Sequence, residues 1–165
     1  MRLLVGAAMA VLLIGCGGEG GSATHVTELT VAHTWARPTP PGATNGVVYF
    51  EVTSPVDDEL LMVSVPTDIA SDAGMHETMG GGGASPMPNM PEMTTAGGEM
   101  TMEPLASLPL PADATVVFAP GGKHVMLTGL VTALVEGSHF VLTLTTKSGH
   151  TVHADVVVSS NPPTA

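Results

Sequence analysis

Short runs of apolar and β-branched residues recur along most of the chain, separated by Pro, Gly, Asp and Asn. Two of these runs, Phe140–Thr145 and Thr151–Val156, alternate apolar and polar residues with the two-residue period of a half-buried strand. No stretch keeps the 3.6-residue period of an amphipathic helix. The pattern predicts strands at Leu29–Trp35, Gly46–Thr53, Leu60–Val65, Thr115–Ala119, Lys123–Leu127, Phe140–Thr146 and Thr151–Val158. Many short strands at this spacing indicate an all-β sandwich or barrel.

Residues 80–98 interrupt this pattern with four consecutive glycines, three prolines and few apolar side chains other than Met. Proline donates no ladder hydrogen bond and glycine weakens a sheet, so this stretch is not a central strand. A loop of this length inside a compact domain is usually functional or disordered. We therefore expect a long loop inserted into one β domain over residues 28–160, followed by a short tail over residues 161–165.

The first residues have the features of a bacterial export signal. Arg2 gives a short positive region, and Leu3–Ile14 is apolar but too short to span a bilayer. The sequence Leu-Ile-Gly-Cys that ends at Cys16 resembles the lipobox of bacterial lipoproteins. We expect a signal peptide over residues 1–15, lipidation of Cys16, and a Gly-rich tether over residues 16–27. An ordinary signal peptide with an incidental cysteine is the alternative.

The lipobox resemblance implies several acyl chains on Cys16, which hold a protein to a membrane more firmly than one chain does. The expected location is therefore the bacterial periplasm or cell envelope, attached to a membrane. Gly17 and Gly18 do not resemble the acidic signal that retains lipoproteins at the inner membrane, which favours the outer membrane.

Charge and cysteine content exclude some classes of function. The chain has fifteen acidic residues against four Lys and Arg, a balance that argues against nucleic acid as a partner. Cys16 is the sole cysteine, so no disulfide can form within the chain. Stability must therefore come from packing.

Methionine is concentrated in one part of the chain. Nine methionines follow residue 15, and seven of them lie between Met75 and Met102. Methionine normally fills gaps in a core, but here it stands among Gly, Pro, Ser and Thr. Thioether sulfur is a soft donor that favours Cu(I), and imidazole also binds copper. Together with the nearby His124-Val125-Met126, the cluster points to copper handling.

Five segments resemble the periplasmic copper chaperones of the PCuAC family. They are residues 35–42, 45–49, 75–78, 100–105 and 120–130, the last being the most similar. The resemblance implies a cupredoxin-like Greek-key β-sandwich that binds one Cu(I) through two His and two Met. It also implies delivery of copper toward the binuclear copper site of cytochrome c oxidase, either directly or through a thiol-bearing Sco-type assembly protein.

The resemblance also implies a ligand pattern of His, ten residues, Met, twenty-one residues, His, one residue and Met. Met102, His124 and Met126 match the second part of the pattern, and on a strand His124 and Met126 project from one face. Twenty-five residues separate His76 from Met102, which an insertion of fifteen explains. Met87 stands at the ten-residue spacing and is a rival. We prefer Met102, because the sequence after it continues without a gap, so the predicted Cu(I) ligands are His76, Met102, His124 and Met126.

The other methionines of this region leave two interpretations open. Met79, Met87, Met90 and Met93 could form a second, weak copper site, since sulfur on a loop can exchange metal readily. They could equally reflect compositional drift within a disordered loop.

Three other functions compete with that of a non-enzymatic copper chaperone. A blue-copper electron carrier needs a Cys thiolate at the metal, and Cys16 would be consumed by lipidation. A hydrolytic metalloenzyme of the His-Glu-x-x-His type lacks its second histidine after His76-Glu77. A lipid-anchored copper-buffering or resistance protein without a specific recipient differs only in the fate of the bound copper, and it remains the alternative.

Overall fold

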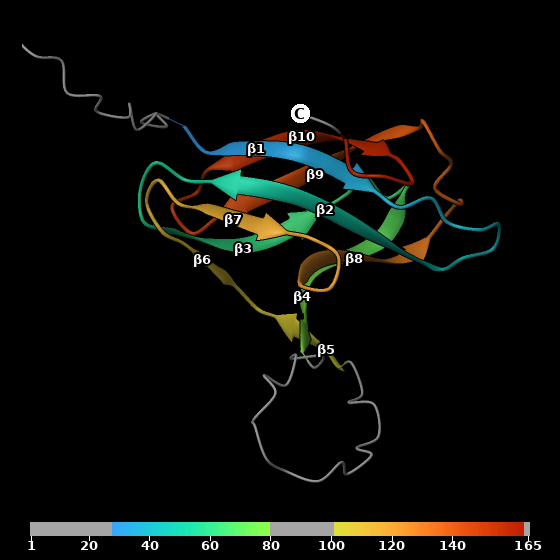
Figure 1. Ribbon diagram of the computed structural model, residues 1–165, viewed down its shortest axis with the longest axis horizontal. Helices are drawn as coiled ribbons and strands as arrows, with labels where there is room; N and C mark the ends of the chain where they lie inside the picture. The colour runs from blue at the N-terminus through green and yellow to red at the C-terminus, as the bar shows by residue number, and fades with distance from the viewer. Residues whose placement is uncertain (1–27, 80–100, 164–165) are drawn as a thin grey trace, which may run out of the picture.

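The computed structural model describes residues 28–79 and 101–163, and within them every regular element is a β-strand (Figure 1). The strands are β1 (Thr30–Ala36), β2 (Asn45–Thr53), β3 (Asp58–Ser64), β4 (Ala70–Met79), β5 (Thr101–Leu105), β6 (Leu108–Leu110), β7 (Thr115–Phe118), β8 (Lys123–Leu130), β9 (His139–Thr146) and β10 (Thr151–Val158). The predicted all-β class is confirmed. In the described ranges no helix is long and apolar enough to cross a membrane.

All seven predicted strands are present, with ends that differ by a few residues. Three strands were not predicted: β4, β5 and β6. β4 carries Gly74 and several polar residues in place of a clear alternation, and β5 and β6 each contain a proline. β5 and β6 are the two ends of the sheet, where proline is tolerated because one side of the strand needs no ladder partner.

The strands form one strongly rolled sheet with the order β5-β4-β8-β2-β1-β10-β9-β3-β6, and β7 pairs additionally with β2. β1 and β10 run parallel, whereas the other registered pairs are antiparallel. Figure 1 shows β1, β2, β9 and β10 stacked around the body of the domain, with β4 and β5 below it. This order places β5, β4 and β8 side by side, although paired residues such as Ala70 of β4 and Leu130 of β8 lie sixty positions apart in the sequence.

Alternate residues of the strands fill the interior of the rolled sheet. Val48, Phe50 and Val52 of β2 are buried, and the Phe50 ring stacks on Phe118 with centroids 4.2 Å apart. Val125 of β8 is also fully buried. Because side chains alternate across a strand, the intervening residues of β2 and β8 face outward from this core. Two of the predicted ligands, His124 and Met126, lie on the outward face of β8.

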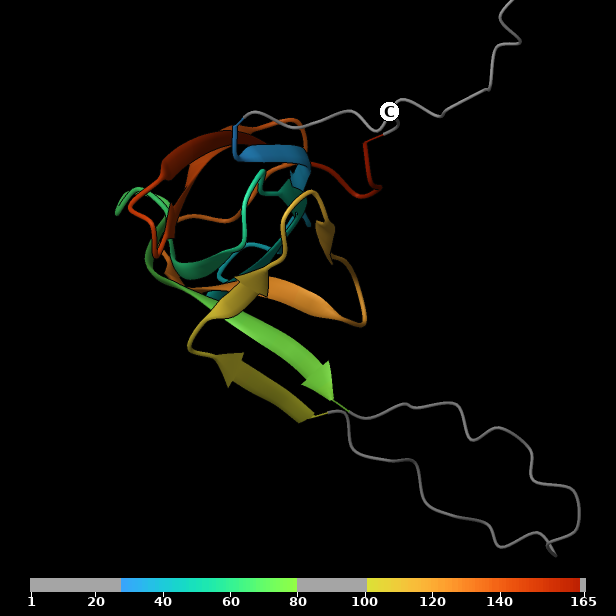
Figure 2. The same ribbon diagram turned by 90° about the vertical axis from the view of Figure 1, so that its left-hand side faces the viewer.

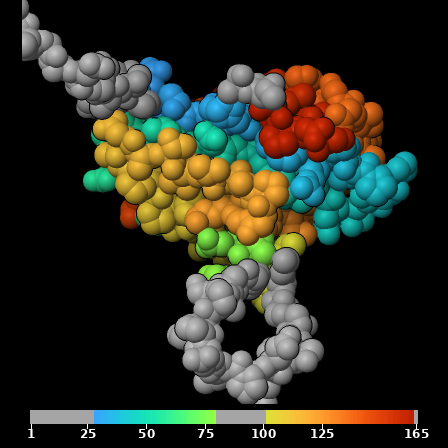
Figure 3. Space-filling view, viewed as in Figure 1, coloured from blue at the N-terminus to red at the C-terminus, as the bar shows by residue number. Residues whose placement is uncertain are grey.

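β4 and β5 extend from the rolled strands as a two-stranded arm (Figure 2). β4 continues the sheet by pairing with β8 from Ala70 to Glu77, so the base of the arm is held by a third strand. In the space-filling view, residues coloured yellow to orange, which include β7, cover part of one face, and green residues of β4 emerge beneath them (Figure 3). The arm is therefore an exposed edge of the sheet.

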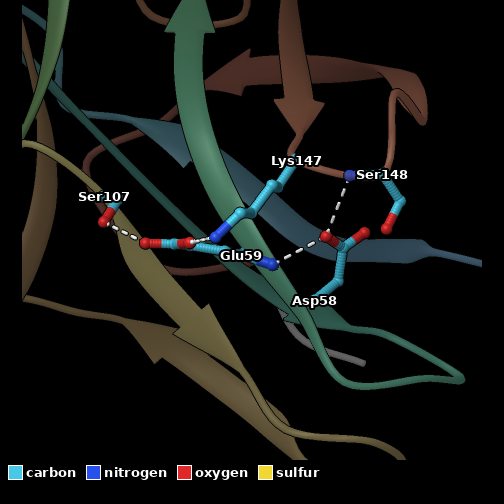
Figure 4. Close-up of polar contacts among 5 residues, drawn as sticks. All are labelled: Asp58, Glu59, Ser107, Lys147 and Ser148. Carbon is cyan, nitrogen blue, oxygen red and sulfur yellow. Dashed lines mark hydrogen bonds and ion pairs between the residues drawn. The ribbon is translucent and has the colours of Figure 1, made fainter.

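The other edge, formed by β6, β3 and β9, carries a cluster of charged and polar groups (Figure 4). Glu59 receives a hydrogen bond from the Ser107 hydroxyl and an ion pair from Lys147 at 2.9 Å. Asp58 accepts hydrogen bonds from the main-chain amides of Glu59 at 2.8 Å and Ser148 at 3.2 Å. The hydroxyl of Ser107 and the ammonium of Lys147 hold the pKa of Glu59 below its ordinary value. Glu59 thus has partners on both carboxylate oxygens, whereas Oδ2 of Asp58 is buried without a hydrogen-bond partner among the described residues.

Candidate metal centre

Strand register brings the four predicted ligands to one face of β5, β4 and β8. His76 lies directly opposite His124, and Gly74 lies opposite Met126. Met102 of β5 lies opposite Thr78, two residues beyond His76. Residues that face each other across a ladder project from the same side, as do residues two apart on a strand. The four side chains therefore share one face of three adjacent strands.

The two imidazoles lie beside each other, with ring centroids 5.9 Å apart and planes inclined by 19°. Each ring also makes a hydrogen bond to its own strand. Nδ1 of His76 lies 3.2 Å from the carbonyl oxygen of Gly74, and Nδ1 of His124 lies 3.0 Å from that of Gly122. Both rings are thus oriented by the main chain of their own strands.

His124, Met102 and Met126 line a common cavity of about 280 Å³. Its other lining residues are Asn45, Gly46, Val47, Tyr49, Thr78 and Gly121. His76 is not part of this lining, but its ring borders that of His124. The structure therefore brings three predicted ligands to one cavity and places the fourth at its margin.

The predicted ligands differ sharply in exposure. His124 is only 5% exposed, whereas Met102 on the edge strand is 58% exposed. His124 is covered because it has neighbours on both sides: His76 on β4, and Tyr49 on β2 at the same level of the sheet. The cavity therefore has a buried histidine at its inner wall and an accessible thioether at its rim.

Tyr49 is a cavity residue that the ligand pattern did not single out. Its ring packs against Trp35 of β1, with centroids 4.8 Å apart and planes inclined by 38°. Both rings are almost fully buried, yet they belong to the outward face rather than to the interior cluster. The sequence predicts that Tyr49 faces outward, because it lies between the two core residues Val48 and Phe50. Its proximity to His124 depends on the pairing of β2 with β8.

The reverse face of the arm has a different character. Glu77 forms an ion pair with Lys123 at 2.9 Å, and Glu103 lies opposite Glu77. Met79 also belongs to this reverse face, because it lies three positions after His76 on the same strand, and it is half exposed. Met75 is buried in the interior cluster, the ordinary role of a methionine. Among the methionines of the described part of β4, none joins the face that carries His76.

The donor set is neutral and soft. In residues 28–79 and 101–163, no three His, Cys, Asp or Glu side chains are placed to hold a metal ion. A metal on this face would therefore need the sulfur atoms of Met102 and Met126 beside the two imidazoles. Thioether and imidazole together suit Cu(I) better than Mg²⁺ or Ca²⁺, which take oxygen ligands. The residues present fit a copper ion.

Four of the predicted site residues lie outside the residues that the structure describes. They are Cys16, Met87, Met90 and Met93. Lipidation, the rival ligand and most of the second methionine site therefore stay predictions.

Solved structures with a similar fold include PCuAC domains. The apo PCuAC domain from PmoF1 has a TM-score of 0.57 and 22% identity, covering 82% of this chain and 97% of that one. The copper-bound PCuAC domain from PmoF2 has a TM-score of 0.56 and 22% identity, covering 82% and 96%. The Cu(I) form of DR1885 from Deinococcus radiodurans has a TM-score of 0.56 and 22% identity, covering 86% and 84%. The shared fold confirms the predicted cupredoxin-like architecture and the resemblance to PCuAC proteins.

Sequence comparison gives the family. A protein of Leifsonia xyli subsp. xyli named "Putative lipoprotein Lxx21020" is 26% identical over 161 residues, which cover 91% of this chain and 86% of that protein. The family described as "Putative lipoprotein LpqE-like" matches residues 29–94 and 87–158, nearly the whole β domain. The chain therefore belongs to the LpqE-like lipoprotein family.

Proposed function

We propose that this protein is a copper chaperone that binds one Cu(I) through His76, Met102, His124 and Met126. The observation that supports it most strongly is the register of β5, β4 and β8, which gathers these four side chains on one face. The copper-bound forms of similarly folded domains add weight, since they show that this fold can carry the metal.

The chemistry of the donors fits a carrier for reduced copper. Imidazole and thioether ligands are neutral, so the bound ion keeps its charge and Cu(I) is favoured over harder cations. Thioethers also form no disulfides, which is an advantage in an oxidising compartment. The domain itself needs no cysteine for this site.

Membership of a lipoprotein family supports lipidation at Cys16 and attachment to the cell envelope. A Gly-rich tether over residues 16–27 would then let the β domain move at the membrane surface. We place the protein in the periplasm, with the outer membrane as the favoured attachment.

Exposure suggests how copper leaves the site. The thioether of Met102 is accessible at the sheet edge, whereas the ring of His124 is covered. A recipient ligand can therefore replace Met102 first and His124 last. The proposed recipient is the copper-binding subunit of cytochrome c oxidase or a thiol-bearing Sco-type assembly protein, and no catalytic turnover is involved.

Cu(I) titration against a competing chelator tests the binding step. The mature chain carrying Cys16→Ser avoids lipidation and leaves the β domain unchanged. We expect one tight Cu(I) per chain, and weaker binding after replacement of any of the four ligands. Tight binding that survives all four replacements would refute the site.

A transfer experiment separates a chaperone from a copper buffer. The loaded protein is mixed with the apo copper-binding subunit of the oxidase, and copper on each protein is measured after separation. We expect net transfer at equal concentrations, and lower oxidase activity in a strain that lacks the protein. Retention of copper, together with normal oxidase activity, would favour the copper-buffering alternative.

A further inference from the structure

The two histidines of the candidate centre share one local arrangement. In each, the ring folds back along its own strand, and Nδ1 reaches the carbonyl oxygen of the residue two positions earlier. The distances are 3.2 Å from His76 to Gly74 and 3.0 Å from His124 to Gly122. The residue two positions earlier is glycine in both cases: Gly74 within β4, and Gly122 just before β8.

A carbonyl oxygen can only accept a hydrogen bond, so the nitrogen that faces it must carry the proton. A neutral imidazole protonated at Nδ1 has its lone pair on Nε2, and the partner of one ring nitrogen decides which nitrogen is left for a metal. We propose that the carbonyl groups of Gly74 and Gly122 fix both rings in the Nδ1–H form, so that copper is bound through Nε2 of His76 and His124. This inference rests on the proposed copper site.

The antiparallel pairing gives the two rings opposite directions. His124 leans toward Gly122, whose carbonyl also accepts the main-chain amide of Thr78 at 3.2 Å. Thr78 lies opposite Met102 on β5, so His124 leans toward the level of Met102. His76 leans toward Gly74, which lies opposite Met126. Each imidazole is therefore tilted toward the level of one thioether, which suits a site with two donors of each kind.

Gly74 has a further role as a positioning residue. A Cβ atom at this position would lie 3.3 Å from Cε1 and 3.8 Å from Nδ1 of His76, so a side chain there would press on the ring and shift it by a few tenths of an ångström. Glycine weakens the interior of a strand, and room for the His76 ring is a physical reason for it here. A Cβ at Gly122 would meet only the carbonyl oxygen of Ala119, at an ordinary 3.7 Å.

The two glycines therefore form a matched pair for mutation. Both substitutions to Ala keep the carbonyl group, but only Gly74→Ala crowds a ligand ring. We expect Gly74→Ala to lower Cu(I) affinity by about 10-fold or more, the lower end of the range for groups that orient metal ligands. We expect Gly122→Ala to change it by less than about 3-fold, below that range.

Long-range ¹H–¹⁵N NMR on the metal-free mature chain with Cys16→Ser tests the proposal directly. The expected result is a protonated Nδ1 and an unprotonated Nε2 for both His76 and His124 at neutral pH, with the Nε2 signals shifting when Cu(I) is added. An Nε2–H form of either ring, or a Cu(I) shift at Nδ1, would overturn it.

The metal-free spectrum does not depend on copper, so its outcome is separable from that of the proposed function. A chain that shows both Nδ1–H rings but binds no Cu(I) would refute the copper site and leave the ring assignment standing. The spectrum also keeps the inference testable if Gly74→Ala fails to fold. Equal Cu(I) affinities for Gly74→Ala and Gly122→Ala would remove Gly74 from the positioning role.

Discussion

The two edges of the rolled sheet use opposite chemistry. At the edge of β6 and β3, charged groups meet: Glu59 is held by Ser107 and Lys147, while Oδ2 of Asp58 is buried without a hydrogen-bond partner in the described part of the chain. At the edge of β5 and β4, imidazole and thioether groups share one face, while the ion pair of Glu77 and Lys123 lies on the reverse face. The first edge is built from ion pairs and hydrogen bonds, whereas the second presents nitrogen and sulfur donors.

This difference shows where function can be sought in a domain of this kind. Charged side chains at the end of a sheet disfavour pairing of the edge strand with another chain, and their ion pairs contribute modestly to stability. Within the residues that the structure describes, the imidazole and thioether groups form no ion pair that would stabilise this face. Metal binding is the explanation that we propose for their convergence. Changes at the two edges should therefore affect different observables: copper affinity at one, and stability at the other.

His124→Ala should have the largest effect on copper. It removes the proposed ligand that is buried between His76 and Tyr49, so we expect Cu(I) affinity to fall by more than about 100-fold, beyond the range for groups that only orient ligands. Glu59→Gln at the other edge is the control and should leave the affinity unchanged. Competition with a Cu(I) chelator measures both, and equal affinities would contradict the division between the edges.

Met102→Leu should have the next largest effect. Leucine is close to methionine in volume and lacks the sulfur, so the fold should tolerate it at this exposed edge position. We expect Cu(I) affinity to fall by about 10-fold or more, as for other changes in a metal's surroundings. Met87→Leu is the matched comparison, because Met87 is the rival ligand by spacing. Reversal of the two effects would transfer the ligand role to Met87.

The two edges should also respond in different ranges of pH. Imidazole must be unprotonated to bind a metal, so copper affinity should fall in acid, where protons compete with the metal for the ring nitrogen. Chelator competition from pH 8 to pH 5 would measure this loss. A flat profile over that range would argue against histidine ligands.

The charged edge should weaken only in stronger acid. Ser107 and Lys147 lower the pKa of Glu59 in the folded state below 4.5, so the stability it contributes is present above the unfolded value and is lost as the pH falls through the folded value. Urea unfolding midpoints at a series of pH values below 5 would measure this for the wild type and Glu59→Gln. The difference between the two proteins should disappear at the lowest pH. A constant difference would contradict this assignment.

Lys147→Met should have the smallest effect. The ion pair with Glu59 is solvent-accessible, and such pairs contribute little to stability in water. We expect a slight decrease in the urea midpoint at low salt, a smaller one at high salt, and no change in Cu(I) affinity. A change in copper affinity would show that the edges are coupled.

Seven strands were predictable because each keeps a run of β-branched or alternating residues. β4 and β5 were not, although they carry His76 and Met102. In β4, Gly74 and several polar residues interrupt the alternation of apolar and polar positions. In β5, Pro104 argues against a strand except at the edge of a sheet. Their pairing joins residues on either side of residues 80–100, and single-sequence patterns do not encode such a contact.

The candidate ligands were predictable from a different signal. His124 and Met126 stand two apart in a clear strand, so their common face followed from the sequence. His76 and Met102 were named through the resemblance to PCuAC proteins, and only the register of three strands shows that they reach the same face. The position of Tyr49 beside His124 could be found only from the structure. The same holds for the contacts of the Gly74 and Gly122 carbonyl groups, because a main-chain contact does not depend on residue type.

X-ray absorption spectroscopy of the Cu(I)-loaded mature chain tests the central claim most directly. We expect a single copper with two nitrogen and two sulfur neighbours, and the loss of one sulfur in Met102→Leu and of one nitrogen in His76→Ala. An all-sulfur environment, or an unchanged spectrum in both variants, would contradict the site on β4, β5 and β8.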